Sequence, residues 1–484
     1  MLLRYLTAVN RGFYSARPMN APGSLAQPLR VAIIGSGPAA FYAAEHLLKQ
    51  EGRPVSVDMI DRLPTPYGLV RGGVAPDHLK IKTVIAIYEK AALNPAFRFF
   101  GNVEFGKHIT RADLERHFHA VIYATGAPSD RRLGVPGEDL QGSHSATEFV
   151  AWYNGHPDFS DRQFDLSAER VAVIGMGNVA IDVARILCLG PGEFKDTDMA
   201  DHAIAALSAS RVREVCIFGR RGPVQAAFTT NEVRELGEMV DADVVVRPEE
   251  AVLDALSLAE LEAARATTRA KVEIVQGYAK RPLSGKRRQL HLRFMRSPLE
   301  IRGDARGHVS SLELGVNRLV RNAADAVVTE ATGERETYGA QLVFRSVGYR
   351  GVALNDVPFD ERSGLIPNLK GRVLAAPGGA PLAGHYASGW IKRGPTGVIG
   401  NNKADSVETV NLMMEDLAAG SLPAPPEPDA ARFDAFVRGK QGTVVTFADW
   451  QKLDRIELDR GRATGRPRVK FTSVDEMLAA LRPS

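Results

Sequence analysis

Two glycine-rich turns hold the residues of this chain whose spacing could do chemistry. Their sequences are VAIIGSGPAA at residues 31–40 and VAVIGMGNVA at residues 171–180. In each, an apolar strand ends in a tight turn that opens a helix, and the free N–H groups of a helix N-terminus can bind a pyrophosphate. Gly35 and Gly175 make the turns, whereas Gly37 and Gly177 let the backbone approach the phosphates. The spacing predicts two dinucleotide sites.

The residues that follow the two turns differ in charge. The first turn is followed by the strand Val55–Ile60 and Asp61, and the second by the strand Val215–Phe218, Arg220 and Arg221. A carboxylate accepts hydrogen bonds from ribose hydroxyls but repels an adenosine 2′-phosphate, which arginine binds bidentately. The contrast predicts FAD at the first turn and NADP(H) at the second. The alternative for the arginine pair is a solvated strand end.

The elements around these turns predict an α/β fold with two Rossmann-like dinucleotide-binding domains. Each turn lies between an apolar strand and a helix, and a later apolar strand accompanies each of them, at 120–127 (AVIYATGA) and 342–349 (LVFRSVGY). Further helices are expected at 39–50, 78–92 and 403–417. We expect one of the two domains to be inserted into the other, so that they do not simply follow one another along the chain.

The order of the segments predicts a nested arrangement. Residues 1–29 form an N-terminal extension, 30–138 and 370–484 form the FAD-binding domain, and 139–369 form an NADP-binding domain inserted into it. The tail after Pro423 is rich in proline at its start and is expected to wrap the FAD-binding domain. No chemistry is expected from the tail.

Length, charge and cysteine content narrow the function. The 484 residues suggest two or three domains, and no apolar run is long enough to span a bilayer. The net charge of +4 suits phosphate ligands or an acidic protein partner and is too small to indicate nucleic acid. The two cysteines, Cys188 and Cys216, cannot form a CxxC dithiol or a four-cysteine iron–sulfur cluster. We therefore exclude disulfide-reductase chemistry, predict no metal site and expect a reducing compartment.

The first 30 residues are basic and contain no acidic residue. They carry Arg4, Arg11, Arg17 and Arg30, and their apolar residues share one helical stripe. This pattern resembles a mitochondrial transit peptide, which would place the protein in the mitochondrial matrix. The chain's preference for arginine over lysine favours a bacterial N-terminus and a cytoplasmic location, and both interpretations stay open.

Four further features could act near the flavin ring. Residues 394–400 (GPTGVIG) open a late helix, and its positive N-terminal end would favour the reduced flavin. Trp390 could lie flat against the flavin or the nicotinamide, although a buried tryptophan is more often part of the core. His78 could hydrogen-bond near the ring, and Asp182 could reach the nicotinamide. A structural role is the alternative for each.

Longer stretches resemble the adrenodoxin reductase-type NADPH:ferredoxin oxidoreductases. The resemblance covers nearly everything after Arg30, and the stretches that carry it are GSGPAAFYAAEHLL from Gly35, PYGLVRGGVAPDH from Pro66, GNV from Gly101, GMGNVAIDVARIL from Gly175, GRRGPVQAAFTTNEVRE from Gly219, SGWIKRGPTGVIG from Ser388 and FADWQKLD from Phe447. It implies a glutathione-reductase-like flavoprotein architecture. One departure is Asp61, where close relatives carry Glu; the shorter acid keeps the charge but requires a closer ribose.

The resemblance also implies which residues contact the cofactors. Beside the glycines of the first turn, those similar in position to FAD contacts are Ala39, Asp61, Leu69, Val103, Phe105, Trp390, Gly397, Val398 and Ile399. Those similar in position to NADPH contacts are Gly175, Met176, Gly177, Asn178, Arg220, Arg221, Glu232 and Gly397. His78 and Asp182 match residues that the family places near the flavin and nicotinamide, with a role in electron or proton transfer.

The implied reaction is hydride transfer from NADPH to FAD, followed by release of single electrons to a [2Fe–2S] ferredoxin. Ferredoxins are commonly acidic, so the basic stretch 280–296 suggests docking at Lys286, Arg287 and Arg288, with a solvated loop as the alternative. Two competing functions share both nucleotide sites. One is an NADPH-dependent flavin monooxygenase or oxidase, and the other is an electron-transfer flavoprotein subunit of a larger complex.

Overall fold

The computed structural model describes residues 22–24 and 27–482, and the expected targeting segment with Arg4, Arg11 and Arg17 lies outside these ranges. The chain forms two compact units. The first comprises the residues up to Tyr67, Ile85–Gly126 and Ala353–Phe447; the second comprises Gly68–Val84, Ala127–Val352 and the residues from Ala448 onward. The two units are described separately below.

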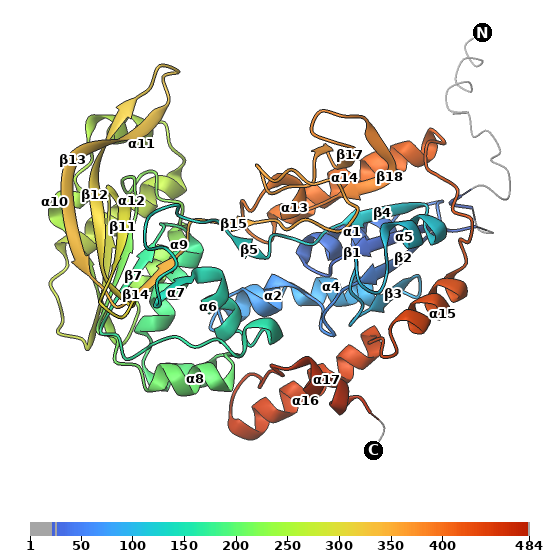
Figure 1. Cartoon of the computed structure of the whole chain (residues 1–484), viewed down its shortest axis with the longest axis horizontal. Helices are drawn as coiled ribbons and strands as arrows, with labels where there is room; N and C mark the ends of the chain where they lie inside the picture. The colour runs from blue at the N-terminus through green and yellow to red at the C-terminus, as the bar shows by residue number, and fades with distance from the viewer. Residues whose placement is uncertain (1–21, 25–26, 483–484) are drawn as a thin grey trace, which may run out of the picture. The chain divides into compact units, whose positions relative to one another are not determined.

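The first unit is built on a seven-stranded sheet in the order β16-β17-β18-β4-β1-β2-β3 (Figure 1). The strands are β1 (Leu29–Ile34), β2 (Val55–Ile60), β3 (Phe97–Phe100), β4 (Ala120–Tyr123), β16 (Asn368–Leu369), β17 (Arg372–Leu374) and β18 (Pro381–Ala387). Its helices are α1 (Pro38–Leu48), α4 (Ile85–Ala92), α5 (Arg111–His117), α13 (Trp390–Arg393), α14 (Asn401–Ala418) and α15 (Ala430–Lys440). The strands from β18 to β3 pair in parallel, and β1 is buried along its whole length.

Strand order fixes where the first unit can bind a ligand. From β1 the chain continues to β2 and β3 on one side, whereas β4 pairs with β1 on the other side. The carboxyl end of β1 therefore lies at a topological switch point, which is where open parallel sheets bind their ligands. Helix α1 begins there and packs against β1, β2, α4 and α14.

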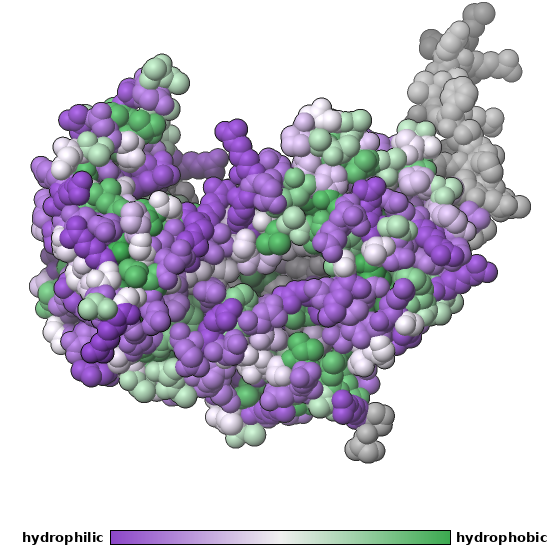
Figure 2. Space-filling model, in the orientation of Figure 1, coloured by the Kyte–Doolittle hydropathy of each residue, from purple (hydrophilic) through white to green (hydrophobic). Residues whose placement is uncertain are grey.

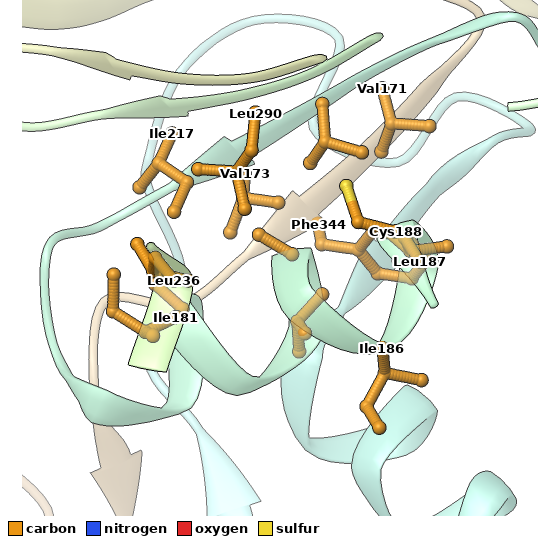
Figure 3. Close-up of a cluster of buried hydrophobic side chains, with 14 of the residues drawn as sticks. Val171, Val173, Ile181, Ile186, Leu187, Cys188, Ile217, Leu236, Leu290 and Phe344 are labelled. Atoms are coloured by element: carbon orange, nitrogen blue, oxygen red, sulfur yellow. The ribbon is translucent and has the colours of Figure 1, made fainter. Parts of the chain in front are cut away.

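The second unit holds a six-stranded sheet in the order β6-β14-β7-β8-β10-β9, and all of its strand pairs are parallel. These strands are β6 (Ser143–Ser145), β7 (Arg170–Ile174), β8 (Glu214–Phe218), β9 (Ala242–Val246), β10 (Arg288–Arg293) and β14 (Leu342–Arg345). Apolar side chains of β7, β8, β10 and β14 pack against α7 (Asn178–Cys188) and α9 (Thr230–Leu236), as Figure 3 shows. The switch point here lies between β7 and β14.

Smaller elements complete the second unit. A three-stranded antiparallel sheet contains β11 (Arg296–Gly303), β12 (Val309–Arg321) and β13 (Val327–Gly339), and a two-stranded one contains β5 (Ser129–Asp130) and β15 (Tyr349–Arg350). The remaining α-helices are α2 (Leu69–Gly72), α3 (Leu79–Lys82), α6 (Ala146–Tyr153), α8 (Asp201–Ser208), α10 (Pro248–Ala251), α11 (Ala255–Glu262), α12 (Ala266–Lys280), α16 (Phe447–Thr464) and α17 (Val474–Ala480). The two Rossmann-like sheets confirm the predicted fold class.

Several element boundaries differ from those expected. The helix expected at 78–92 is divided into α3 and α4, and the strand expected at 342–349 ends at Arg345. Helix α12 has an inner face that is buried at Val272 and Val275. The apolar residues of that face are spaced by three, which fits one side of a helix packed on the core.

We expected the tail after Pro423 to wrap the FAD-binding domain; its part up to Phe447 is grouped with the first unit, and its part from Ala448 onward with the second. Buried charges explain this grouping. Lys470 Nζ lies 3.2 Å from Asp198 Oδ1, and the same carboxylate accepts from Lys82 at 2.7 Å. Glu457, which is fully buried, accepts from Arg71 and Arg468 at 2.8 Å each. The tail therefore ties the segment Gly68–Val84 into the second unit.

Replacing Glu457 with glutamine is expected to lower the free energy of unfolding by about 3–5 kcal/mol, because Arg71 and Arg468 would lose their buried counter-charge. Burial alone would raise the pKa of Glu457, but the two guanidinium groups outweigh it and hold the pKa below its ordinary value. The carboxylate therefore stabilises the fold fully at neutral pH, and this contribution is lost as the pH falls below the ordinary glutamate range. Denaturant unfolding of parent and variant at several pH values measures both effects.

Asp459→Asn is the matched control on the same helix, because the ion pair of Asp459 with Arg462 is exposed on both sides. Exposed pairs contribute under about 1 kcal/mol, so this control should unfold nearly as the parent does. Equal losses in the two variants would contradict the assigned role of Glu457.

The face drawn in Figure 2 is mostly hydrophilic, and its apolar residues occur in small scattered groups. Within the described part of the chain, none of the helices is both long enough and apolar enough to cross a membrane.

Candidate functional site

The turn after β1 is tightly constrained at Gly35. Its φ is +98°, and its N–H donates to the carbonyl of Ile60 at 2.8 Å. A Cβ at this position would lie 2.6 Å from the carbonyl oxygen of Ala124, so no larger residue fits. At Gly37, by contrast, an added Cβ would meet nothing within 4 Å. This open space at the N-terminus of α1 is what a pyrophosphate would fill, and the turn therefore fits a dinucleotide.

Asp61 lies directly after β2 and faces the same turn. Its Oδ2 accepts from the Ser36 hydroxyl at 2.6 Å, and its Oδ1 accepts from the Leu63 N–H at 2.9 Å. Burial raises the pKa of Asp61, and these hydrogen bonds counteract part of that shift. Each carboxylate oxygen keeps a further lone pair, which a ribose hydroxyl could use. The Asp61 carbonyl accepts from Val103 N–H at 2.9 Å, so the predicted FAD contacts Asp61 and Val103 lie together.

The segment from Ser388 packs on the start of α1. Gly389 has φ +80°, and a Cβ there would lie 2.6 Å from the Cβ of Ala39. Ser406 of α14 donates to the Ala39 carbonyl at 2.9 Å. The structure thus brings Ala39 next to the residue that precedes Trp390. Phe105 is half-buried, and its ring packs on that of Tyr123.

A further tight turn, at Gly397, precedes α14. Gly397 has φ +77°, and the N–H of Val398 donates to Asn401 Oδ1 at 2.8 Å, with Ile399 completing the turn. Val398 is exposed, so the turn is open to a ligand. The start of the 18-residue helix α14 carries its positive dipole end, and the N–H groups of Asn401, Asn402 and Lys403 there donate to carbonyls of the turn.

The turn after β7 repeats the geometry of the first turn. Gly175 has φ +131°, and a Cβ there would lie 2.0 Å from the carbonyl oxygen of Ser346. The space beside Gly177 is open within 4 Å, so this turn also fits a pyrophosphate. The Met176 carbonyl accepts from the N–H groups of Ala227 and Phe228 at 2.8 and 3.0 Å. This binds the glycine turn to the loop that follows Arg221.

Arg220 and Arg221 are both exposed, and neither guanidinium forms a hydrogen bond or an ion pair with the described residues. Their backbone, in contrast, is held firmly. The Arg220 carbonyl accepts from Asn317 Nδ2 at 2.9 Å, and the Arg221 carbonyl accepts from Met295 N–H at 3.3 Å. A fixed backbone with two free guanidinium groups suits recognition of a phosphate.

His78 lies within a group of charged side chains in the second unit. Its Nδ1 lies 3.9 Å from Asp182 Oδ1, and its Nε2 lies 2.7 Å from Glu235 Oε2 and 2.9 Å from Arg185 Nη2. Arg185 also donates to Asp182 at 2.9 Å and pairs with Asp77. A neutral Nε2 would accept from Arg185, whereas a protonated Nε2 would donate to Glu235. The tautomer of His78 is thus coupled to these neighbours.

Burial shifts the acids of this group. It raises the pKa of Asp182 well above the ordinary range, and the charges of Glu232 and Glu235 add to the shift. The pKa of Glu232 is also raised, by burial and by Glu235. Carboxyl groups of this kind can hold a proton at neutral pH. The candidate ligand atoms of His78, Asp182 and Glu232 lie within 4.8 Å of one another, but Arg185 already supplies the positive charge between them.

Comparisons with known proteins find relatives over nearly the whole chain. The family model for pyridine nucleotide-disulphide oxidoreductase matches residues 29–193. NADPH-ferredoxin reductase FprA of Mycobacterium tuberculosis is 47% identical over 93% of this chain and 99% of its own length. The mitochondrial NADPH:adrenodoxin oxidoreductase of Bos taurus is 40% identical over 94% of this chain and 92% of its own. The solved structure of Mycobacterium tuberculosis FprA in complex with NADPH matches with a TM-score of 0.88 and covers 94% of this chain and all of that one.

The chain belongs to the adrenodoxin reductase family. This confirms the resemblance that the long sequence stretches indicated. Among the predicted site residues of this reductase-family chain, the first unit holds Asp61, Val103 and Ala39, and the second holds Arg220, Arg221, Asn178, His78, Asp182 and Glu232. Leu69, a predicted FAD contact, belongs to the second unit and its role stays a prediction.

Several residues that contact the predicted site residues were not predicted from the sequence. Ser36 orients Asp61, and Arg185 and Glu235 flank His78. A signal was present for two of them, since Arg185 follows Asp182 by three residues and Glu235 follows Glu232 by three, a spacing that places side chains on one helix face. Asn317 comes from β12, about 100 residues after Arg220, and no local pattern marks it.

Proposed function

We propose that the chain is an FAD-dependent NADPH–ferredoxin reductase. The observation that carries the proposal is the pair of glycine turns that are followed by residues of opposite charge. Asp61 follows the first turn, and Arg220 and Arg221 follow the second. Relatives that share 40–47% of its residues over nearly the whole chain are named NADPH-ferredoxin reductase and NADPH:adrenodoxin oxidoreductase. FAD when bound takes a hydride from NADPH and releases electrons one at a time, which suits a [2Fe–2S] ferredoxin.

In this proposal, the residues of the chain bind FAD and NADPH and orient them. Gly35 and Gly37 admit the FAD pyrophosphate and Asp61 accepts from its ribose. Further FAD contacts are proposed at Ala39, Leu69, Val103, Phe105, Trp390, Gly397, Val398 and Ile399. Gly175, Met176, Gly177 and Asn178 would bind the NADPH pyrophosphate, and Glu232 and Gly397 are further proposed NADPH contacts. His78 and Asp182, with the neighbours described above, hold and move a proton next to the reacting rings.

Anaerobic mixing of the flavin-loaded protein with NADPH tests the proposal directly. Oxidised flavins absorb at about 450 nm, and we expect this absorbance to bleach when NADPH reduces the flavin. Bleaching should be nearly complete with excess NADPH. Cytochrome c reduction should then depend on added ferredoxin. Absence of bleaching would remove the reductase function, and oxygen consumption that ferredoxin does not change would favour the oxidase or monooxygenase alternative.

The proposed partner is an acidic ferredoxin, but the docking residues need correction. Arg288 is only 1% exposed, because it lies in β10 between β8 and β9, where its guanidinium pairs with Asp241. It cannot meet a partner. Lys286 is half-buried and donates to the Met239 carbonyl at 2.6 Å. Arg287 is exposed and remains the candidate of the three.

Ferredoxin-dependent turnover is expected to weaken with salt more than NADPH-dependent reduction of a neutral dye. Charge steering between a basic and an acidic protein is screened beyond about 10 Å at 0.1 M salt. Steady-state rates at 20–300 mM salt, measured with both acceptors, check this. Equal sensitivity of the two reactions would count against electrostatic docking.

The proposed location is the cytoplasm of a bacterium, which the preference for arginine over lysine favours. Cys188 and Cys216 are free and buried, which fits any reducing compartment. The mitochondrial matrix is the alternative.

A further inference from the structure

A buried lysine lies beneath the loop that follows the arginine pair. Lys271, on α12, is 7% exposed. Its ammonium donates to the carbonyl of Ala226 at 2.5 Å and to that of Val224 at 3.3 Å. It also lies 5.6 Å from the centre of the Phe228 ring, within the range of a cation–π contact. Burial of an ammonium is costly, so a role beyond packing is worth seeking.

The loop that Lys271 supports joins the two halves of the proposed NADPH site. It starts directly after Arg221, and its far end holds the glycine turn through two hydrogen bonds to the Met176 carbonyl. The Thr229 N–H donates to Asn178 Oδ1 at 2.8 Å. The two carbonyls that Lys271 binds lie between these ends. A change in the loop would therefore move the arginines relative to the pyrophosphate turn.

The charge of Lys271 also acts on this site. Burial lowers the pKa of Lys271, Glu260 of α11 raises it, and the positive charge of Arg221 lowers it further. The positive charges of Lys271 and Arg221 thus lie close enough to repel each other. A dianionic phosphate bound between Arg220 and Arg221 would lie in the field of a third cation.

We propose that Lys271 is a positioning residue for the adenosine 2′-phosphate: it fixes the loop at residues 221–229 and adds positive charge beneath it. The inference rests on the proposed function, because it assumes that the glycine turn after β7 and the arginine pair bind NADPH. It goes beyond the arginine pair, since Lys271 is buried and donates to carbonyls of the loop, whereas both arginines are exposed. NADPH should therefore be affected by its loss more strongly than NADH.

Equilibrium binding by calorimetry tests the proposal without any need for turnover. The probes are NADP+ and 2′,5′-ADP, which carry the 2′-phosphate, and NAD+ and ADP, which do not. For Lys271→Met, a side chain of similar length without charge, we expect about tenfold weaker binding of the first pair and a change of less than about twofold for the second. Lys280→Met is the matched control, because Lys280 is exposed in the last turn of the same helix.

Lys271→Gln separates the two parts of the role and guards against misfolding of the methionine variant. The amide can still donate to the loop carbonyls but has no charge. Intermediate weakening of NADP+ binding would support both parts of the proposal. Parent-like NADP+ binding in both variants, or equal weakening for NADP+ and NAD+, would overturn it. A parent protein that binds none of the four probes would instead refute the proposed function and this inference with it.

Discussion

Replacing Arg220 and Arg221 together by alanine is expected to raise the KM for NADPH about 100- to 1,000-fold. Hydrogen bonds to a charged group contribute about 1.5–3 kcal/mol each, and two exposed guanidinium groups at the lower end of this range would together contribute about 3–4 kcal/mol to binding of the 2′-phosphate. NADH has no such phosphate, so its KM should stay within about twofold of the parent value. Steady-state reduction of ferricyanide with each nucleotide measures the change. The value of kcat should move little, because hydride transfer takes place at the other end of the nucleotide.

The structure makes this double variant a clean test. Both side chains are exposed and form no hydrogen bond or ion pair within the described residues, so their removal should leave the free energy of unfolding nearly unchanged. Arg234→Ala is a suitable control, since that arginine is exposed on α9 of the same unit and lies outside the proposed phosphate site. Loss of activity with both nucleotides would show that the arginines do not read the 2′-phosphate.

The local geometry that the sequence predicts correctly has local causes. A glycine turn between a buried strand and a helix is specified by residues next to one another, and both turns have the expected geometry at Gly35 and Gly175. Each φ is positive, so the backbone itself selects glycine there. The charge contrast between Asp61 and the arginine pair could be read from the sequence for the same reason. Each follows its strand directly.

Contacts between distant segments escaped sequence analysis. The pairing of Lys82 and Lys470 with Asp198 joins residues more than 100 positions apart, and only the folded chain shows which acid serves which base. Lys271 is similar, since its partners Val224 and Ala226 offer only backbone carbonyls. Backbone acceptors leave no mark in a sequence. From the sequence, a buried lysine of this kind could not be distinguished from a solvated one.

Arg288 shows that a readable signal can be overlooked. The density of basic residues around it suggests a docking face. The same stretch alternates, however, and Arg288, Leu290 and Leu292 are all buried in β10. Period-two alternation indicates a strand with one inner face. The strand pattern, taken together with the charge pattern, would have placed Arg288 inside the sheet.

Gly35→Ala is expected to give a protein without bound FAD. A methyl group there would lie 2.6 Å from the backbone oxygen of Ala124, and alanine at φ +98° is itself strained. Because the obstruction is backbone of the neighbouring chain segment, it cannot be relieved by a side-chain rotation. We expect the first unit to lose stability by about 2–4 kcal/mol and the purified protein to lack flavin absorbance, even after incubation with excess FAD.

Two further glycines separate the effect on folding from the effect on binding. Gly37 has φ −80° and open space around it, so Gly37→Ala should fold as the parent does but bind FAD at least about tenfold more weakly, since its methyl group occupies the place of the pyrophosphate. Gly439 is the penultimate residue of α15, also in open space, and Gly439→Ala should retain FAD and gain at most about 0.5–1 kcal/mol of helix stability. Full flavin occupancy in the Gly37 variant would show that the pyrophosphate does not cross the N-terminus of α1.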